Sequence, residues 1–384
     1  MTPSSPWSRE AIVSVFPKLE SKIETDVAIV GGGIAGVMCA YELTVAGKKV
    51  ALLEQDVIAS GSSGWTTAFI TQVIDATLGE LQSRFGRDAA ALVWKSGAAA
   101  VDELERIITT EKIDCEFVRC PAKIFATDQA GLGRLKNEEK LATAFGLKAK
   151  TETEALGFDA LGYLNVPGQA KFNPVKFLTA VAERITERGG RIFEHTTVLD
   201  YANGSPLIVK TKDGEVRAKQ IVIATELPKG NFEAIKKRIS VYQTYALEAT
   251  APKSGLAEGI YWDTQKPYHY FRVDKLADRE RIILGGEDHL LAEKHDRAAC
   301  FLKLKNFLKD LLPDSEQEII REWSGGILET TDGLPFIGEA AKNIFVATGF
   351  SGNGMTFGAL SATIIRDLIL EKPSPASGLY KVLR

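Results

Sequence analysis

A glycine motif near the N-terminus, Gly31-x-Gly33-x-x-Gly36, constrains the fold of this chain more than any other feature. It follows an apolar strand predicted at 26–30 and opens a helix predicted at 34–46. A second strand is predicted at 50–54 and ends in Glu54. The order strand, turn, helix, strand within roughly 30 residues is typical of a dinucleotide-binding βαβ unit.

Each part of this motif has a physical role. The first glycine permits the tight turn, the second lets the backbone approach a pyrophosphate, and the third lets helix and strand pack closely. The helix start at Ile34 and Ala35 presents unpaired N–H groups and a positive dipole end to phosphates. Glu54, followed by Gln55, stands where a carboxylate binds ribose hydroxyls. A glycine turn without a ligand does not account for this combination. The sequence contains one such unit, which would bind either NAD alone or FAD alone.

The remaining pattern predicts an α/β fold with two interleaved domains. Helices are predicted at 87–110, 131–145, 174–188, 295–312 and 359–370. Strands are predicted at 191–193, 197–201, 207–211, 221–224, 242–249, 268–273, 281–284 and 344–348. Dinucleotide-type elements recur at both ends and in the middle. We therefore expect a Rossmann-like domain from 1–80, 155–235 and 320–384, and a smaller α+β substrate domain from 81–154 and 236–319.

Composition excludes several classes of function. The net charge of −3 gives no reason to expect a nucleic-acid partner. The longest apolar run, 27–41, is shorter than the about 20 residues of a membrane span, and the leader over 1–23 does not have a signal-peptide pattern. Four scattered cysteines favour a reducing compartment, so we expect a cytoplasmic protein. No histidine pair has metal-ligand spacing, and no metal is expected.

Two further segments carry a family resemblance: SGSSGWTTAF at 60–69, and DGLPFIGE with IFVATGFSGNGMTFG between 332 and 358. With them the chain resembles the FAD-dependent D-amino-acid oxidase superfamily, and within it the glycine, sarcosine and γ-glutamylputrescine oxidase-like branch. The resemblance implies FAD as the cofactor. Some relatives attach FAD through a cysteine near the C-terminal block, but no cysteine follows Cys300, so non-covalent FAD is expected. Other relatives carry a C-terminal Rieske domain with Cys and His ligands, and no such cluster is expected here.

The resemblance also implies further cofactor contacts. The glycine-rich segment at 349–356 would approach the flavin, with the following helix directing its N-terminus there; the alternative is a plain loop that caps a helix. The loop at 60–67 would follow the pyrophosphate, or else be an ordinary surface loop. Glu226 stands where glycine is common in the family. The residues implied are Ser62, Ser63, Thr66, Thr67, Val198, Ala224, Thr225, Gly325, Gly349, Phe350, Ser351, Gly352, Asn353, Gly354, Met355 and Thr356.

The predicted substrate wall is the strand that contains Tyr268, Tyr270 and Arg272. Strand alternation places these three side chains on one face. An arginine can clamp a carboxylate through two hydrogen bonds, and tyrosines can wall a pocket. The alternative is a sheet face with a solvated arginine and packed rings. Tyr242 and Tyr245, on the preceding strand, are further candidates for the pocket. Trp323 would border the flavin, or else be a core tryptophan.

The resemblance implies oxidation of a C–N bond in a small amino acid or amine, with a hydride passing to flavin N5. Oxygen or another electron acceptor would then reoxidise the flavin. One alternative is a dehydrogenase that passes electrons to a quinone or carrier protein. Another is a non-catalytic FAD-binding assembly or scaffold protein, and an NAD-only dehydrogenase leaves the C-terminal glycine segment unexplained. Oligomeric state stays open.

Overall fold

The strand before the glycine motif lies at the centre of the first sheet. The computed structural model describes residues 6–7, 15–202, 204–228, 230, 232–252 and 255–384, so part of the predicted leader lies outside it. In it β1 (Lys22–Val30) pairs in parallel with β2 (Val50–Leu53) and with β10 (Glu215–Ile223). The strand order of this eight-stranded sheet is β16-β17-β10-β1-β2-β7, with β9 beside β10 and β8 beside β9. Its other strands are β7 (Arg191–Phe193), β8 (Val198–Ala202), β9 (Leu207–Thr211), β16 (Phe336–Ala341) and β17 (Ile344–Thr348).

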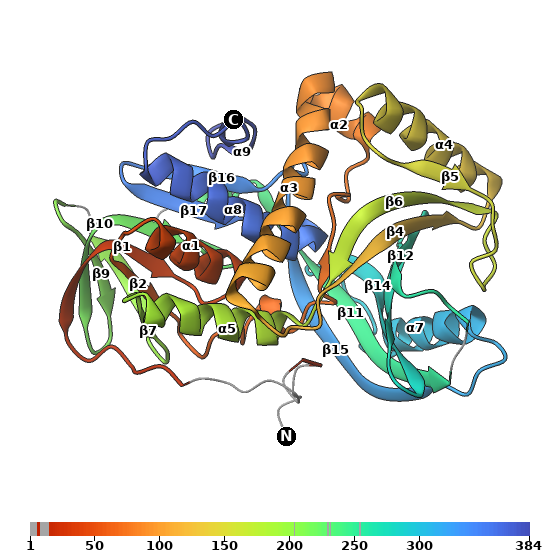
Figure 1. The fold of residues 1–384 in the computed structure, drawn as a ribbon, viewed down its shortest axis with the longest axis horizontal. Coiled ribbons are helices and arrows are strands. Elements are labelled where there is room, and N and C mark those ends of the chain that lie inside the picture. The colour runs from red at the N-terminus through yellow and green to blue at the C-terminus, as the bar shows by residue number, and fades with distance from the viewer. Residues whose placement is uncertain (1–5, 8–14, 203, 229, 231, 253–254) are drawn as a thin grey trace.

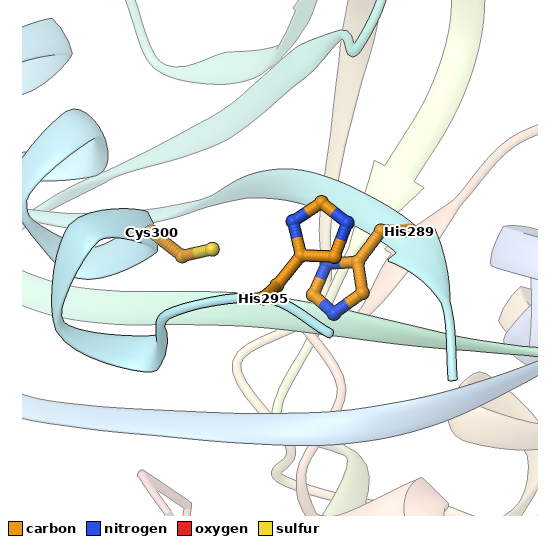
Figure 2. A group of neighbouring side chains, drawn as sticks. All are labelled: His289, His295 and Cys300. Carbon is orange, nitrogen blue, oxygen red and sulfur yellow. The ribbon is translucent and has the colours of Figure 1, made fainter. Parts of the chain in front are cut away.

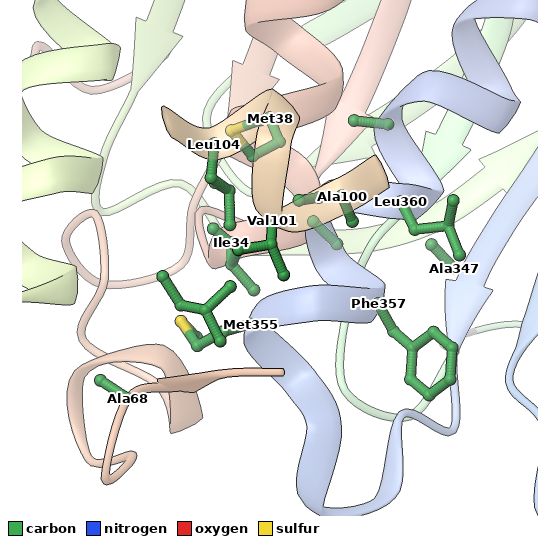
Figure 3. Close-up of a cluster of buried hydrophobic side chains, with 14 of the residues drawn as sticks. Ile34, Met38, Ala68, Ala100, Val101, Leu104, Ala347, Met355, Phe357 and Leu360 are labelled. Carbon is green, nitrogen blue, oxygen red and sulfur yellow. The ribbon is translucent and has the colours of Figure 1, made fainter. Parts of the chain in front are cut away.

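Both faces of this sheet are buried, which explains why β1 is apolar along most of its length. Alternate residues point to opposite faces. Val27 and Ile29 belong to a core that includes α1 (Ile34–Val45), α5 (Pro174–Glu187) and α8 (Gly354–Ile369). Ala28 and Val30 pack with side chains of β8 and β9 on the other face. Figure 3 shows the helix side, where Ile34 and Met38 of α1 meet side chains of α8 and of the long helix α3 (Arg87–Glu111).

A nine-stranded, largely antiparallel sheet forms the second half of the molecule (Figure 1). Its order is β15-β11-β14-β13-β12-β4-β6-β3, and β5 pairs with β6. The strands are β3 (Phe69–Ile70), β4 (Val118–Ala126), β5 (Lys150–Glu152), β6 (Gly162–Lys171), β11 (Ile239–Pro252), β12 (Gly259–Asp263), β13 (His269–Lys275), β14 (Arg279–Leu290) and β15 (Glu318–Thr330). One core of this sheet packs against α7 (Arg297–Leu311), through Phe301 and Leu304.

The remaining helices are short or peripheral. They are α2 (Leu78–Phe85), α4 (Gln129–Ala144), α6 (Glu233–Lys236), α9 (Ser377–Tyr380) and the single 3₁₀ turns at Ser62–Gly64 and Ser351–Asn353. Among the described residues, no helix combines the length and the apolar character that a bilayer crossing needs.

Several segments that the sequence assigns to the first domain belong to the second sheet. The expected boundaries put 155–235 and 320–384 with the first sheet, but β6 and most of β15 pair in the second sheet. The short strand β3, expected within the first domain, also pairs with β6. Strand pairing between distant segments determines these memberships, and local composition does not report it. Residues 81–154, which were predicted to belong to the substrate domain, also contribute to both halves, because α3 packs against α8 of the first half.

A buried ion network centred on Asp274 of β13 connects three strands of the second sheet, β6, β13 and β14. The Asp274 carboxylate is 5% exposed and accepts hydrogen bonds from Lys171 Nζ at 2.6 Å, Arg272 Nη2 at 2.8 Å and Arg281 Nε at 2.8 Å. Burial opposes its ionisation, but the three cations hold the pKa of Asp274 well below its usual range. The Trp7 ring lies within 5.0 Å of both the Arg272 and Arg281 guanidinium carbons. The network therefore also contacts Trp7.

Removing the central carboxylate should destabilise the protein strongly. Asp274→Asn leaves three buried cations without their shared anion, and breaking a buried ion pair typically costs about 3–5 kcal/mol. We expect a lower urea midpoint of unfolding for the variant. Asp278→Asn, an exposed position on the same β13–β14 hairpin, should stay within about 0.5 kcal/mol of the native protein. Equal midpoints for the two variants would show that the network contributes no net stability.

Candidate functional site

A cavity of about 520 Å³ runs between the two sheets. It begins at the turn after β1, passes the start of α8 and reaches the edge of β12 and β13. Its described lining contains every cofactor-binding residue predicted from the sequence except Gly36 and Thr356. The structure therefore brings together three segments that are far apart in the sequence, around residues 31, 62 and 350.

The glycine turn has the geometry that its sequence predicts. Gly31 has a φ of +109°, which side chains rarely permit, and a Cβ added to Gly36 would lie 1.8 Å from the Gly31 carbonyl oxygen. Gly36 thus serves the close crossing of the chain and does not line the cavity. No side chain caps the N-terminus of α1, although the Ile34 N–H donates to Ser63 Oγ at 2.9 Å. An uncapped helix start on a cavity is suited to a phosphate group.

Glu54 lies at the rim of this turn, at the end of β2. Its carboxylate accepts hydrogen bonds from the Gly32 N–H at 2.6 Å and from the Asp56 N–H at 2.9 Å. These bonds fix the carboxylate and leave acceptor sites on both oxygens. Such an oriented carboxylate fits the hydroxyl pair of a ribose.

The second glycine segment brings another helix start to the cavity. Gly349 has a φ of +74°, and the chain then enters α8, whose N-terminus also has no side-chain cap. A Cβ on Gly358 would lie 2.5 Å from Ile34 Cγ2, so α8 and α1 approach closely at their N-terminal ends. Thr356, which was predicted to contact the cofactor, does not belong to the described cavity lining. Its hydroxyl instead binds the backbone of Thr71, and the residue is 1% exposed.

Aromatic side chains form the wall at the far end of the cavity. Tyr268 and Tyr270 both line it, as predicted, together with Phe69, Trp262 and Trp323. The Phe69 ring meets Tyr270 edge-on at 5.9 Å between centroids, and the Tyr270 hydroxyl lies 3.1 Å from Thr244 Oγ1. The Trp323 indole N–H donates to the Trp65 carbonyl at 2.8 Å. These contacts fix the rings in place.

The predicted role of Arg272 as a carboxylate clamp is wrong, because the structure places its guanidinium outside the cavity lining. Arg272 is 1% exposed. Besides Asp274, its Nη1 donates to the Phe172 carbonyl at 2.9 Å and the Thr67 carbonyl at 3.2 Å. Alternation along β13 was predicted correctly, but the chain around Thr67 covers this position. Arg272 therefore holds the loop in place and has no free donor pair for a ligand.

Three acidic side chains near the aromatic wall were missed by the sequence analysis. Asp75 lines the cavity and accepts from the Gly352 N–H at 3.1 Å. Burial raises the pKa of Asp75, and burial with the charges of Asp75 and Asp288 raises the pKa of Glu329 to about 7. Burial, together with the Asp75 charge, also raises the pKa of Asp288 to about 6. No short motif unites these residues, because they come from a loop, β14 and β15.

A second group of polar side chains lies beside α7, away from this cavity (Figure 2). The ligand atoms of His289, His295 and Cys300 lie within 4.8 Å of one another. The two imidazole rings stack with centroids 3.7 Å apart and planes 19° apart. Ring-nitrogen lone pairs lie in the ring planes, so stacked rings do not direct them to one point. As placed, the group is a stacked histidine pair beside a thiol.

The acidic cluster makes a testable contribution to stability. The folded-state pKa of Glu329 lies above its unfolded value, so Glu329 destabilises the fold progressively as pH rises through that interval. We expect Glu329→Gln to raise the free energy of unfolding by about 1 kcal/mol near pH 8, after allowance for partial solvent screening. The difference should vanish near pH 4. Thermal midpoints at both pH values test this, with the exposed Glu316→Gln as the control; a gain that is equal at both pH values would contradict it.

Comparison with known proteins supports these observations. Residues 26–368 match the DAO family model, described as FAD dependent oxidoreductase. The chain is 29% identical to the putative Rieske 2Fe-2S iron-sulfur protein YhfW of Bacillus subtilis, over 98% of this chain and 75% of that one. It is 24% identical to gamma-glutamylputrescine oxidoreductase of Escherichia coli, over 92% and 85% of the two chains. The crystal structure of glycine oxidase from Geobacillus kaustophilus superposes with a TM-score of 0.78 at 21% identity, covering 94% of this chain and 99% of that one.

The match to the family model covers most of the chain and includes the glycine turn, the aromatic wall and the second glycine segment. The chain belongs to the DAO family of FAD-dependent oxidoreductases.

Proposed function

We propose that this enzyme oxidises a carbon–nitrogen bond of a small amine or amino acid. The observation that carries the proposal is the continuity of the cavity, which extends from the glycine turn to the aromatic wall. One part has the shape and donors for a dinucleotide, and the other part is apolar with a few polar groups. A pocket of this kind can hold a small substrate against a cofactor.

The residues present fit non-covalent FAD. The uncapped start of α1 and the turn at Gly31 would hold the pyrophosphate, Glu54 the ribose, and the strand at Val198 the adenine. The uncapped start of α8 would stabilise negative charge on the ring system. None of the four cysteines belongs to the described lining, so no thiol is placed for a covalent bond to the cofactor.

When bound, FAD supplies an acceptor for a hydride from the carbon beside the substrate nitrogen, and water hydrolyses the resulting imine. The protein's contribution is to position the substrate and exclude water. Tyr268, Tyr270 and Trp262 form a wall that would hold the substrate carbon and shield it from solvent.

Anaerobic mixing with candidate substrates tests this proposal. Purified protein should be yellow, and one class among amino acids, N-methyl amino acids and amines should bleach its flavin absorbance. Readmission of air then separates an oxidase, which regains colour and forms hydrogen peroxide, from a dehydrogenase that needs another acceptor. A yellow protein that none of these compounds bleaches would favour a non-catalytic FAD-binding role. A colourless protein that FAD does not reconstitute would refute the proposal.

Glu54 provides a test of the cofactor position alone. Glu54→Gln removes the charged acceptor at the rim while it preserves the side-chain shape, so the dissociation constant for FAD should rise about tenfold. Titration of apoprotein with FAD, followed by flavin fluorescence, measures this. Glu20→Gln, at an exposed position, should bind FAD as the native protein does. An unchanged constant for Glu54→Gln would place the ribose elsewhere.

A further inference from the structure

Building on the proposed function, we propose that the substrate is a diamine or polyamine whose second ammonium group binds Asp75 beside the aromatic wall. Asp75 would then be a specificity-determining residue, and Asp288 and Glu329 would strengthen the negative potential around it. The substrate would carry no carboxylate at that end.

The position of Asp75 makes it suitable for this role. Asp75 lies on the loop between β3 and α2 and lines both the main cavity and a smaller one of about 350 Å³. Ile74, Ser351 and Asn353 also line both cavities, so the two spaces meet around this carboxylate. Among the described residues, Asp75 accepts one backbone hydrogen bond, from Gly352, and a hydrogen bond from the Tyr268 hydroxyl. A carboxylate has about four acceptor sites, so at least one stays available to an ammonium group.

Two more carboxylates act on the same space. Glu329 lines the smaller cavity, and its charge interacts with those of Asp75 and Asp288. Asp288 contacts the Thr244 hydroxyl, and Thr244 lines the main cavity. The Oδ1 atom of Asp288 is buried and has no hydrogen-bond partner. Three carboxylates that repel one another in a partly desolvated space are stabilised by a bound cation.

The aromatic wall is an independent observation that also favours a cation. Tyr268 and Tyr270 lie 5.5 Å apart between ring centroids, and Phe69 lies 6.4 Å from Trp262. All four rings line the main cavity, as Asp75 does, and the Tyr268 hydroxyl binds Asp75 directly. Aromatic faces attract ammonium groups, most strongly where water is excluded. Rings and a carboxylate together form an environment suited to an alkylammonium group.

The same lining is poorly suited to a carboxylate. Among the described residues of the main cavity, none has a cationic side chain, whereas Glu54, Asp56, Asp75 and Glu226 are acidic. Arg272, the predicted clamp, is committed to Asp274. In the described lining of the smaller cavity Arg84 is the cation, and its Nη1 donates to the Asp332 carbonyl at 3.2 Å. A substrate carboxylate beside Asp75 would therefore meet like charge.

A matched series of ligands tests the proposal without turnover. The ligands are 1,4-diaminobutane, 1-aminobutane and 4-aminobutanoate, which differ only in the group at one end. The titration uses the anaerobic holoenzyme with its flavin reduced beforehand, which cannot accept a hydride from the ligand. Quenching of tryptophan fluorescence then reports binding alone, because Trp262 and Trp323 line the cavity. We expect the diamine to bind at least about tenfold more tightly than 1-aminobutane, and 4-aminobutanoate to bind most weakly.

The variant Asp75→Asn then identifies the residue responsible. It should bring the affinities for the diamine and 1-aminobutane to within about twofold, with 1-aminobutane binding little changed. Asp310→Asn, an exposed acid on α7, removes the same charge and should keep the native preference. If Asp75→Asn does not fold, the ligand series on the native holoenzyme decides alone.

The outcomes separate this inference from the proposed function. Tighter binding of 4-aminobutanoate than of the diamine, or an unchanged preference in Asp75→Asn, would overturn the role of Asp75. Bleaching of the flavin by amino acids but not by diamines would support the proposed oxidation and refute this substrate class. Selective diamine binding without any bleaching would support the cation site and refute the oxidation.

Discussion

The carboxylate of Asp274 holds the arginine that fastens the cavity loop around Thr67 to the second sheet. It orients Arg272, whose guanidinium in turn binds the Thr67 and Phe172 carbonyls, so the loop after the 3₁₀ turn at 62–64 is tied to the second sheet. That loop lines the cavity, as do Tyr270 of β13 and Tyr268, which directly precedes β13. Hydrogen bonds from β13 therefore hold the loop beside the aromatic rings.

Local sequence patterns predicted those elements whose backbone conformation depends mainly on the residues within them. The β1–α1–β2 unit and the strand at 344–348 were predicted within one or two residues for most ends, although β1 extends four residues earlier. The glycine segments were placed at the cavity because positive φ and close helix contacts require residues without side chains. At these glycines the residue type itself indicates the backbone conformation. The motif therefore predicts where the segment lies in the fold.

Arg272 and Asp75 show what local patterns cannot provide. Alternation along β13 correctly grouped Arg272 with the two tyrosines, but it does not report which distant loop covers each position. Asp75 belongs to no regular element, and it reaches the cavity because Gly352 donates a hydrogen bond to it from 277 residues away. The predicted domain boundaries differ from the observed sheet membership for the same reason, since β6 and β15 pair with strands that are remote in the sequence. Contacts of this kind depend on the assembled fold.

The cavity combines positive potential from helix N-termini with negative charge from acidic side chains, and the two would act on different ligands, the cofactor and the substrate. The uncapped starts of α1 and α8 supply positive potential from backbone N–H groups alone. An anionic cofactor can be bound in this way without a lysine or arginine in the described lining. The charged side chains of the described lining are all acidic, and under the inference above Asp75 would serve the substrate. Recognition of phosphate by backbone N–H groups is compatible with such a pocket, because it requires no cationic side chain that could pair with Asp75.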